Sequence, residues 1–104
     1  FGGGTTTYES IWMGVPVITM VGESIMGRLT GSVMNRLGYS EFITTSPTTY
    51  VSAAKEVSSD LARLSKIREN LRDTASKSIF DGRQYVRELE DACREIWANY
   101  CENN

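Results

Sequence analysis

The chain has 104 residues, of which 40% are hydrophobic and 23% are charged, so it has the length and composition of one globular domain. Its formal net charge is −2 and its basic residues are interleaved with acidic ones, which argues against a nucleic-acid partner. The chain contains no histidine, so we expect no imidazole-based acid, base or metal site.

No apolar run in the sequence reaches the roughly 20 residues that cross a bilayer, and no basic-then-apolar signal opens it. We therefore expect a soluble, cytoplasmic protein with no membrane partner. The two cysteines, Cys93 and Cys101, lie in one predicted helix at a separation of about 12 Å, given ~1.5 Å per residue. That distance is too long for a disulfide, so they do not indicate an oxidising compartment.

The stretch from Phe1 to Gly14 begins with three glycines, Gly2–Gly4, which are followed by three threonines. Glycine lets the backbone approach a ligand closely, and Thr5, Thr6 or Thr7 can cap the helix that follows. The N–H groups and the positive dipole end of such a helix attract anions, so the stretch predicts a phosphate-binding loop. Because the chain begins without Met inside this loop, we expect it to be the C-terminal fragment of a longer protein.

A first helix is predicted over residues 6–13. Thr6 and Glu9 fit a capping box, in which the hydroxyl accepts from the Glu9 N–H and the carboxylate reaches back. Gly14 is placed to end this helix in a left-handed turn. Residues 15–20 are almost continuously apolar, which predicts a strand buried on both faces of a parallel sheet. The residues on the apolar side of the helix, predicted to face the core, are Tyr8, Ile11 and Trp12.

A second unit of strand, turn and helix follows. Ser24 is predicted to cap a helix over residues 25–37, Gly38 to end it, and residues 41–43 to form a very short strand. This order predicts that residues 1–45 are the α/β part of a sheet with ligand loops at the carboxyl ends of its strands. The apolar positions of the helix are Ile25, Met26, Leu29, Val33, Met34 and Leu37.

Residues 46–104 are predicted to be entirely helical, with helices from Thr48 to a break at 58–60, over 61–75 and over 82–100. The middle helix has an apolar stripe of Leu61, Leu64, Ile67, Leu71 and Ala75. Its charged side, interpreted as solvated surface, is Arg63, Lys66, Arg68, Glu69, Arg72 and Asp73. The stripe of the last helix is Tyr85, Val86, Leu89, Cys93, Ile96, Trp97 and Tyr100. We infer that this aromatic stripe packs on another part of a longer protein, because contiguous apolar surface usually marks an interface.

One block of residues, from Gly3 to Thr19, reads Gly-Gly-Thr-Thr-Thr-Tyr-Glu-Ser-Ile-Trp-Met-Gly-Val-Pro-Val-Ile-Thr. Further blocks are Gly22-Glu23-Ser24 with Arg28, Leu37-Gly38, Phe80-Asp81, Glu88-Leu89-Glu90 with Trp97, and Tyr100-Cys101. Together they resemble the C-terminal end of the O-linked N-acetylglucosamine transferase family over nearly the whole chain. The resemblance implies the C-terminal part of a GT-B, Rossmann-like nucleotide-binding lobe, with one or two short parallel strands and a mostly helical tail.

Members of that family often carry tetratricopeptide repeats, and they transfer a sugar from a UDP-sugar, here N-acetylglucosamine, to protein Ser or Thr, or to Asn in a bacterial branch. The implied ligands of the UDP diphosphate are Gly4, Thr5 and Thr6, that of the ribose is Glu9, and the pocket supports are Gly3, Thr7, Glu23 and Arg28. The implied partners are the UDP-sugar donor, a protein acceptor and the upstream lobe, without a further cofactor. The family's catalytic lysine lies upstream, so this chain alone should not catalyse transfer.

Several residues keep a second interpretation. Gly4 stands where some members have a histidine, and Glu9 stands where the animal enzymes have aspartate. Glu9 also fits the capping box without any ligand, and Glu23 and Arg28 also fit an ion pair at the surface. A non-catalytic scaffold that binds partners, or another GT-B enzyme that uses UDP-sugars, remains the alternative function. A half-sheet with open edges and an uncovered helix also predicts a homodimer.

Overall fold

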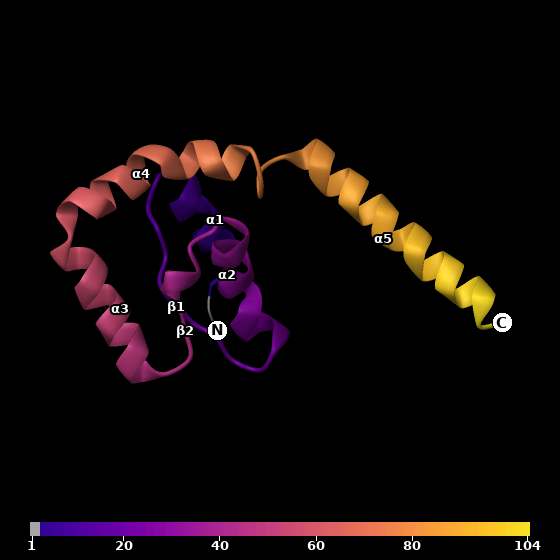
Figure 1. Ribbon diagram of the computed structural model, residues 1–104, viewed down its shortest axis with the longest axis horizontal. Helices are drawn as coiled ribbons and strands as arrows, with labels where there is room; N and C mark the ends of the chain where they lie inside the picture. The colour runs from indigo at the N-terminus through magenta and orange to yellow at the C-terminus, as the bar shows by residue number, and fades with distance from the viewer. Residues whose placement is uncertain (1–2) are drawn as a thin grey trace.

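The computed structural model describes residues 3–104, which form a small α/β unit, two further helices and a projecting C-terminal helix (Figure 1). The elements in chain order are α1 (Thr5–Trp12), β1 (Thr19–Met20), α2 (Ile25–Arg36), the 3-10 helix η1 (Ser40–Phe42), β2 (Ile43–Thr44), α3 (Pro47–Ser59), α4 (Leu61–Ser76) and α5 (Gly82–Glu102). Gly2, which we predicted to belong to the phosphate loop, lies outside the described residues.

Helix α1 begins one residue earlier than predicted, at Thr5, and its N-cap is Gly4, which has no side chain. The predicted threonine cap and the capping box between Thr6 and Glu9 are therefore wrong. Thr6 lies inside the first turn, and Glu9 belongs to the second turn, beyond reach of the helix start. The cause is the backbone of Gly3, whose φ of 90° turns the chain into the helix before the threonines.

Helices α1 and α2 end as predicted, in glycines that adopt the left-handed conformation. Gly14 and Gly38 have φ values of 76° and 85°. The Gly14 N–H bonds back to the Ile11 carbonyl at 3.0 Å, which satisfies one of the carbonyls that a helix end leaves unpaired. The start of α2 is also confirmed, because the Ser24 hydroxyl accepts from the Gly27 N–H at 3.1 Å.

Strands β1 and β2 pair in parallel, with Thr19 opposite Ile43, which confirms the predicted parallel sheet. Both strands are shorter than predicted. Residues 15–18 are not in the strand, because the two residues of β2 offer them no partner. In the segment 41–43 only Ile43 is strand, since the residues before it coil into η1. The predicted burial on both faces is also wrong, because Met20 is 46% exposed.

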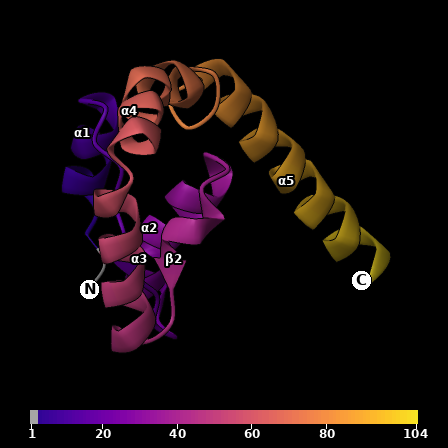
Figure 2. The same ribbon diagram turned by 60° about the vertical axis from the view of Figure 1, so that its left-hand side comes forward.

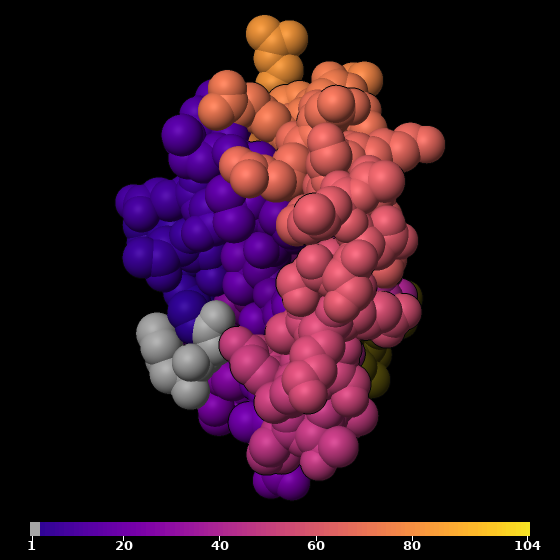
Figure 3. Space-filling model, turned by 90° about the vertical axis from the view of Figure 1, so that its left-hand side faces the viewer, coloured from indigo at the N-terminus to yellow at the C-terminus, as the bar shows by residue number. Residues whose placement is uncertain are grey.

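The core lies between α1, α2, η1, α3 and α4. Its buried residues are Ile11, Val33, Met34, Leu37, Phe42, Val57, Ile67, Leu71 and Ala75. Helices α3 and α4 form a continuous ridge beside the N-terminal part of the chain (Figure 3). Large apolar residues that we predicted to face the core but that are exposed include Tyr8, Trp12, Ile25 and Leu61. Ile25 and Leu61 are the first residues of α2 and α4 and lie at the edge of the core.

Helix α5 projects away from the other elements, as the two ribbon views agree (Figures 1 and 2). Its whole apolar stripe is exposed, including Ile96 at 69% and Trp97 at 65%. It is tied to α2 by one ion pair, in which Arg36 donates to Glu88 at 2.9 Å. This bond, together with one from Gln84, lowers the pKa of the Glu88 carboxyl. No helix within residues 3–104 is long and apolar enough to cross a membrane.

Candidate functional site

The predicted anion site lies where the glycine loop enters α1. Helix geometry leaves the first N–H groups of a helix without a partner inside it. The Thr7 N–H turns back to the Gly4 carbonyl at 2.9 Å, which leaves the N–H groups of Thr5 and Thr6 directed out of the helix end. The side chains of both residues are exposed. Two N–H donors and two hydroxyls thus surround the positive end of a helix dipole, an arrangement that favours phosphate.

The two described glycines of the loop meet different surroundings. A Cβ on Gly3 would lie 2.8 Å from the Thr7 hydroxyl oxygen, and the φ of 90° already disfavours a side chain there. A Cβ on Gly4 would meet no atom within 4 Å. Gly3 is therefore required by the packing of the loop, whereas Gly4 faces open space with room for a larger side chain.

Glu9 lies on the same side of α1 as Thr5, because residues four apart on a helix are neighbours. Its side chain is exposed, and no salt bridge between residues 3–104 involves it. With the capping box absent, the carboxylate is not committed to the helix start. Thr5, Thr6 and Glu9 therefore present donors at the helix end and an acceptor one turn along the same face.

The four predicted pocket supports are placed in two groups. Gly3 and Thr7 lie in the loop and the first turn of α1, where the Thr7 hydroxyl is buried. Glu23 and Arg28 are exposed in the turn before α2 and in its first half. The ion pair that we considered between them is not formed, since Arg28 donates instead to the Gly22 carbonyl at 3.3 Å.

The other end of α1 is held by two arginines of α4. Arg68 donates to the Gly14 carbonyl at 3.1 Å, and Arg72 donates to the Trp12 carbonyl. The Arg72 guanidinium also lies 4.7 Å from the centre of the Trp12 ring. Both arginines are exposed, as predicted for this side of the helix, and they also bond to the end of α1. Cations are favoured where a helix ends in unpaired carbonyls. The sequence pattern alone did not show that these two arginines would lie at the end of α1.

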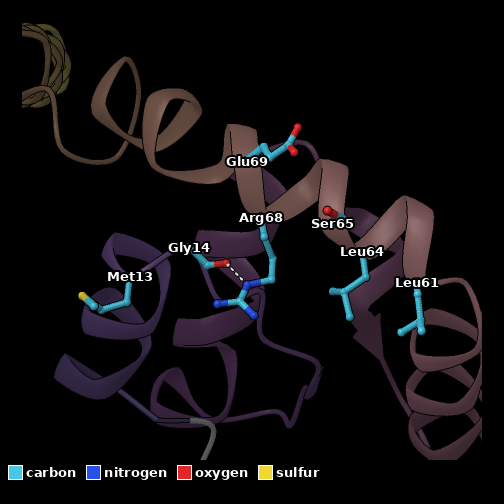
Figure 4. Close-up of a pocket in the computed structure, with 7 residues that line it drawn as sticks. All are labelled: Met13, Gly14, Leu61, Leu64, Ser65, Arg68 and Glu69. Carbon is cyan, nitrogen blue, oxygen red and sulfur yellow. Dashed lines mark hydrogen bonds between the residues drawn. The ribbon is translucent and has the colours of Figure 1, made fainter.

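A cavity of about 440 Å³ opens beside these arginines (Figure 4). Its lining residues are Met13, Gly14, Leu61, Leu64, Ser65, Arg68 and Glu69. Figure 4 shows the Arg68 side chain reaching from α4 to Gly14 across this space. The cavity lies at the C-terminal end of α1 and is therefore separate from the glycine loop.

A glycine loop that opens a helix beside a parallel sheet is the arrangement of nucleotide-binding α/β proteins. Comparison with known proteins shows which family within this class the chain belongs to. The model of glycosyl transferase family 41 matches residues 1–89, and the chain belongs to this family. The resemblance stated from the sequence is confirmed.

Two curated relatives and one solved structure support this membership. The "Probable UDP-N-acetylglucosamine--peptide N-acetylglucosaminyltransferase SPINDLY" of Hordeum vulgare is 35% identical over 105 residues, covering 100% of this chain and 11% of the relative. The UDP-N-acetylglucosamine–peptide N-acetylglucosaminyltransferase of Caenorhabditis elegans is 31% identical over 94% of this chain and 9% of its own length. A mutant of the Thermobaculum terrenum O-GlcNAc transferase superposes with a TM-score of 0.84 at 37% identity, covering 97% of this chain and 20% of that structure. This match confirms the predicted GT-B fold class, and the chain spans about a tenth of its curated relatives.

Proposed function

We propose that this chain is the donor-nucleotide part of a glycosyltransferase that moves N-acetylglucosamine from a UDP-sugar to Ser or Thr of a protein. The observation that carries the proposal is the start of α1, where the N–H groups of Thr5 and Thr6 have no partner inside the helix. In this proposal Gly4, Thr5 and Thr6 bind the diphosphate, and Glu9 accepts hydrogen bonds from the ribose. The names of the relatives support the sugar and the peptide acceptor.

The same donors would also assist the reaction. When the bond between the sugar and the diphosphate breaks, negative charge grows on the departing β-phosphate oxygens. N–H groups that already point at this position stabilise that charge more than they stabilise the ground state, which lowers the barrier. We propose that the catalytic lysine is supplied from outside this chain, as the family resemblance implies, and that the chain alone does not catalyse transfer.

The exposed stripe of α5 is proposed to bind the upstream lobe of the same protein. Its positions Val86, Leu89, Cys93, Ile96 and Tyr100 alternate in steps of three and four, the spacing that packs against another helix. Within residues 3–104 this stripe has no partner. A homodimer through the same surface is the alternative, and sedimentation of the isolated chain as a compact monomer would count against it.

Titration calorimetry of the full-length protein with UDP tests the nucleotide site. Thr6→Ala and Glu9→Ala should each weaken UDP binding by about ten- to hundredfold, because a hydrogen bond to a charged group contributes roughly 1.5–3 kcal/mol. Thr48→Ala is the matched control for the first, since Thr48 occupies the same position in the first turn of α3. Glu56→Ala, an exposed glutamate of α3, is the control for the second. Unchanged affinity in both site variants would refute the proposed site.

A further inference from the structure

A buried pair of hydroxyl groups lies behind the glycine loop. The Oγ1 atoms of Thr7 in α1 and Thr30 in α2 are 3.0 Å apart, and the two residues are only 4% and 1% exposed. Thr30 Oγ1 also donates to the Gly3 carbonyl at 3.5 Å. Either hydroxyl of this pair can donate to the other. One chain of hydrogen bonds thus runs from α1 through α2 to the backbone of the loop.

The loop backbone also packs directly on this pair. A Cβ added to Gly3 would lie 2.8 Å from Thr7 Oγ1 and 3.6 Å from Thr30 Oγ1, so no side chain fits between the loop and the hydroxyls. Gly3 is followed at once by the N-cap Gly4 and by Thr5, the first residue of α1. The position of the Gly3 peptide therefore determines where the first N–H groups of the helix point.

We propose that Thr30 and Thr7 are positioning residues for the donor nucleotide, an inference that rests on the proposed function. Neither side chain touches the nucleotide. The buried pair fixes the glycine loop so that the N–H groups of Thr5 and Thr6 already point at the diphosphate before it binds. Donors that are ordered in advance bind more tightly, because less conformational freedom is lost on binding. Burial makes the pair effective, since a broken hydrogen bond in the interior is costly.

A second buried threonine serves as a control that separates an effect on nucleotide binding from a general loss of stability. Thr44 is 6% exposed, and its Oγ1 donates to the Thr19 carbonyl at 2.8 Å between the two strands. It therefore matches Thr30 in residue type, burial and bond to a backbone carbonyl. No side-chain hydrogen bond joins it to Gly3 or Gly4, the described glycines of the loop. Thr44→Val should reduce stability as Thr30→Val does, without the effect on the nucleotide.

The test is titration calorimetry of the full-length protein with UDP. Thr30→Val keeps the shape of the side chain and removes the hydroxyl, and it should raise the Kd for UDP by about tenfold. Thr30→Ser, which keeps the hydroxyl, and Thr44→Val should each stay within about twofold of the unsubstituted protein. A Thr30→Val protein that binds UDP normally overturns the inference. An equal loss in Thr44→Val, or no rescue in Thr30→Ser, overturns it as well.

Thr7→Val keeps the inference testable if Thr30→Val does not fold, because it breaks the same pair from α1. It should also weaken UDP binding, and the double variant should bind no more weakly than Thr30→Val alone, since the two hydroxyls act as one unit. Additive losses would overturn the inference. If the unsubstituted protein does not bind UDP, the proposed function fails. If it binds UDP and Thr6→Ala weakens binding while Thr30→Val does not, only the positioning role fails.

Discussion

Gly3→Ala should loosen the start of α1, whereas Gly4→Ala, one residue further along, should not. An L-residue at the observed φ of 90° costs roughly 1–2 kcal/mol. The new Cβ would also stand 2.8 Å from Thr7 Oγ1, so that the bond to Thr30 must shift, which adds about 1 kcal/mol. The sum is about 2–3 kcal/mol. A Cβ at Gly4 meets nothing within 4 Å, and its effect should stay within about 1 kcal/mol.

Amide hydrogen exchange of the full-length protein measures this difference locally, because the exchange rates of helix amides report the free energy of local opening. A loss of about 2–3 kcal/mol corresponds to amides of α1 that exchange roughly 30 to 150 times faster. Gly4→Ala should change these rates by less than about fivefold. Equal protection of α1 in the Gly3→Ala and unsubstituted proteins would refute the reasoning that Gly3 is required by its conformation and its contact.

Two further predictions concern the helices that hold α1 and α5. Leu71→Ala should lower the free energy of opening of α4 by about 2–5 kcal/mol, because Leu71 is 0% exposed. Leu61→Ala on the same helix should cost less than about 1 kcal/mol, because Leu61 is 70% exposed. Similar losses in the two variants would contradict the assigned core. The lowered pKa of Glu88 means that its contact stabilises the protein above the ordinary carboxyl pKa and is lost as the pH falls through the lowered value. In an NMR titration Arg36→Ala should raise the pKa of Glu88, and an unchanged value would show that this ion pair is absent in solution.

The features that the sequence predicted correctly are those encoded within a few residues. The glycines that end α1 and α2, and the serine that begins α2, act through bonds to the adjacent turn. The parallel pairing also followed from local pattern, because alternating strands and helices have few ways to pack. The family resemblance rested on the same kind of local order, in the block from Gly3 to Thr19.

The features that the sequence did not predict depend on contacts between distant residues. Thr7 and Thr30 are 23 positions apart, and Arg72 and Trp12 are 60 apart, so no local spacing marks either pair. The capping box failed for a related reason. Thr6 and Glu9 have the correct spacing, but the conformation of Gly3 starts the helix one residue earlier. The capping-box spacing and the Gly3 conformation favour different helix starts, and the packing of the loop on α2 favours the second.

Helix α1 has eight residues, so it is about 12 Å long at ~1.5 Å per residue. A helix of this length is rigid, and both of its ends are held by side chains of other helices. Thr30 holds the loop at one end, while Arg68 and Arg72 hold the carbonyls at the other. Displacing α4 would therefore also displace the carbonyl end of α1 as long as these bonds hold. Under the proposed function, a displacement of α4 would change nucleotide binding without any contact between α4 and the nucleotide.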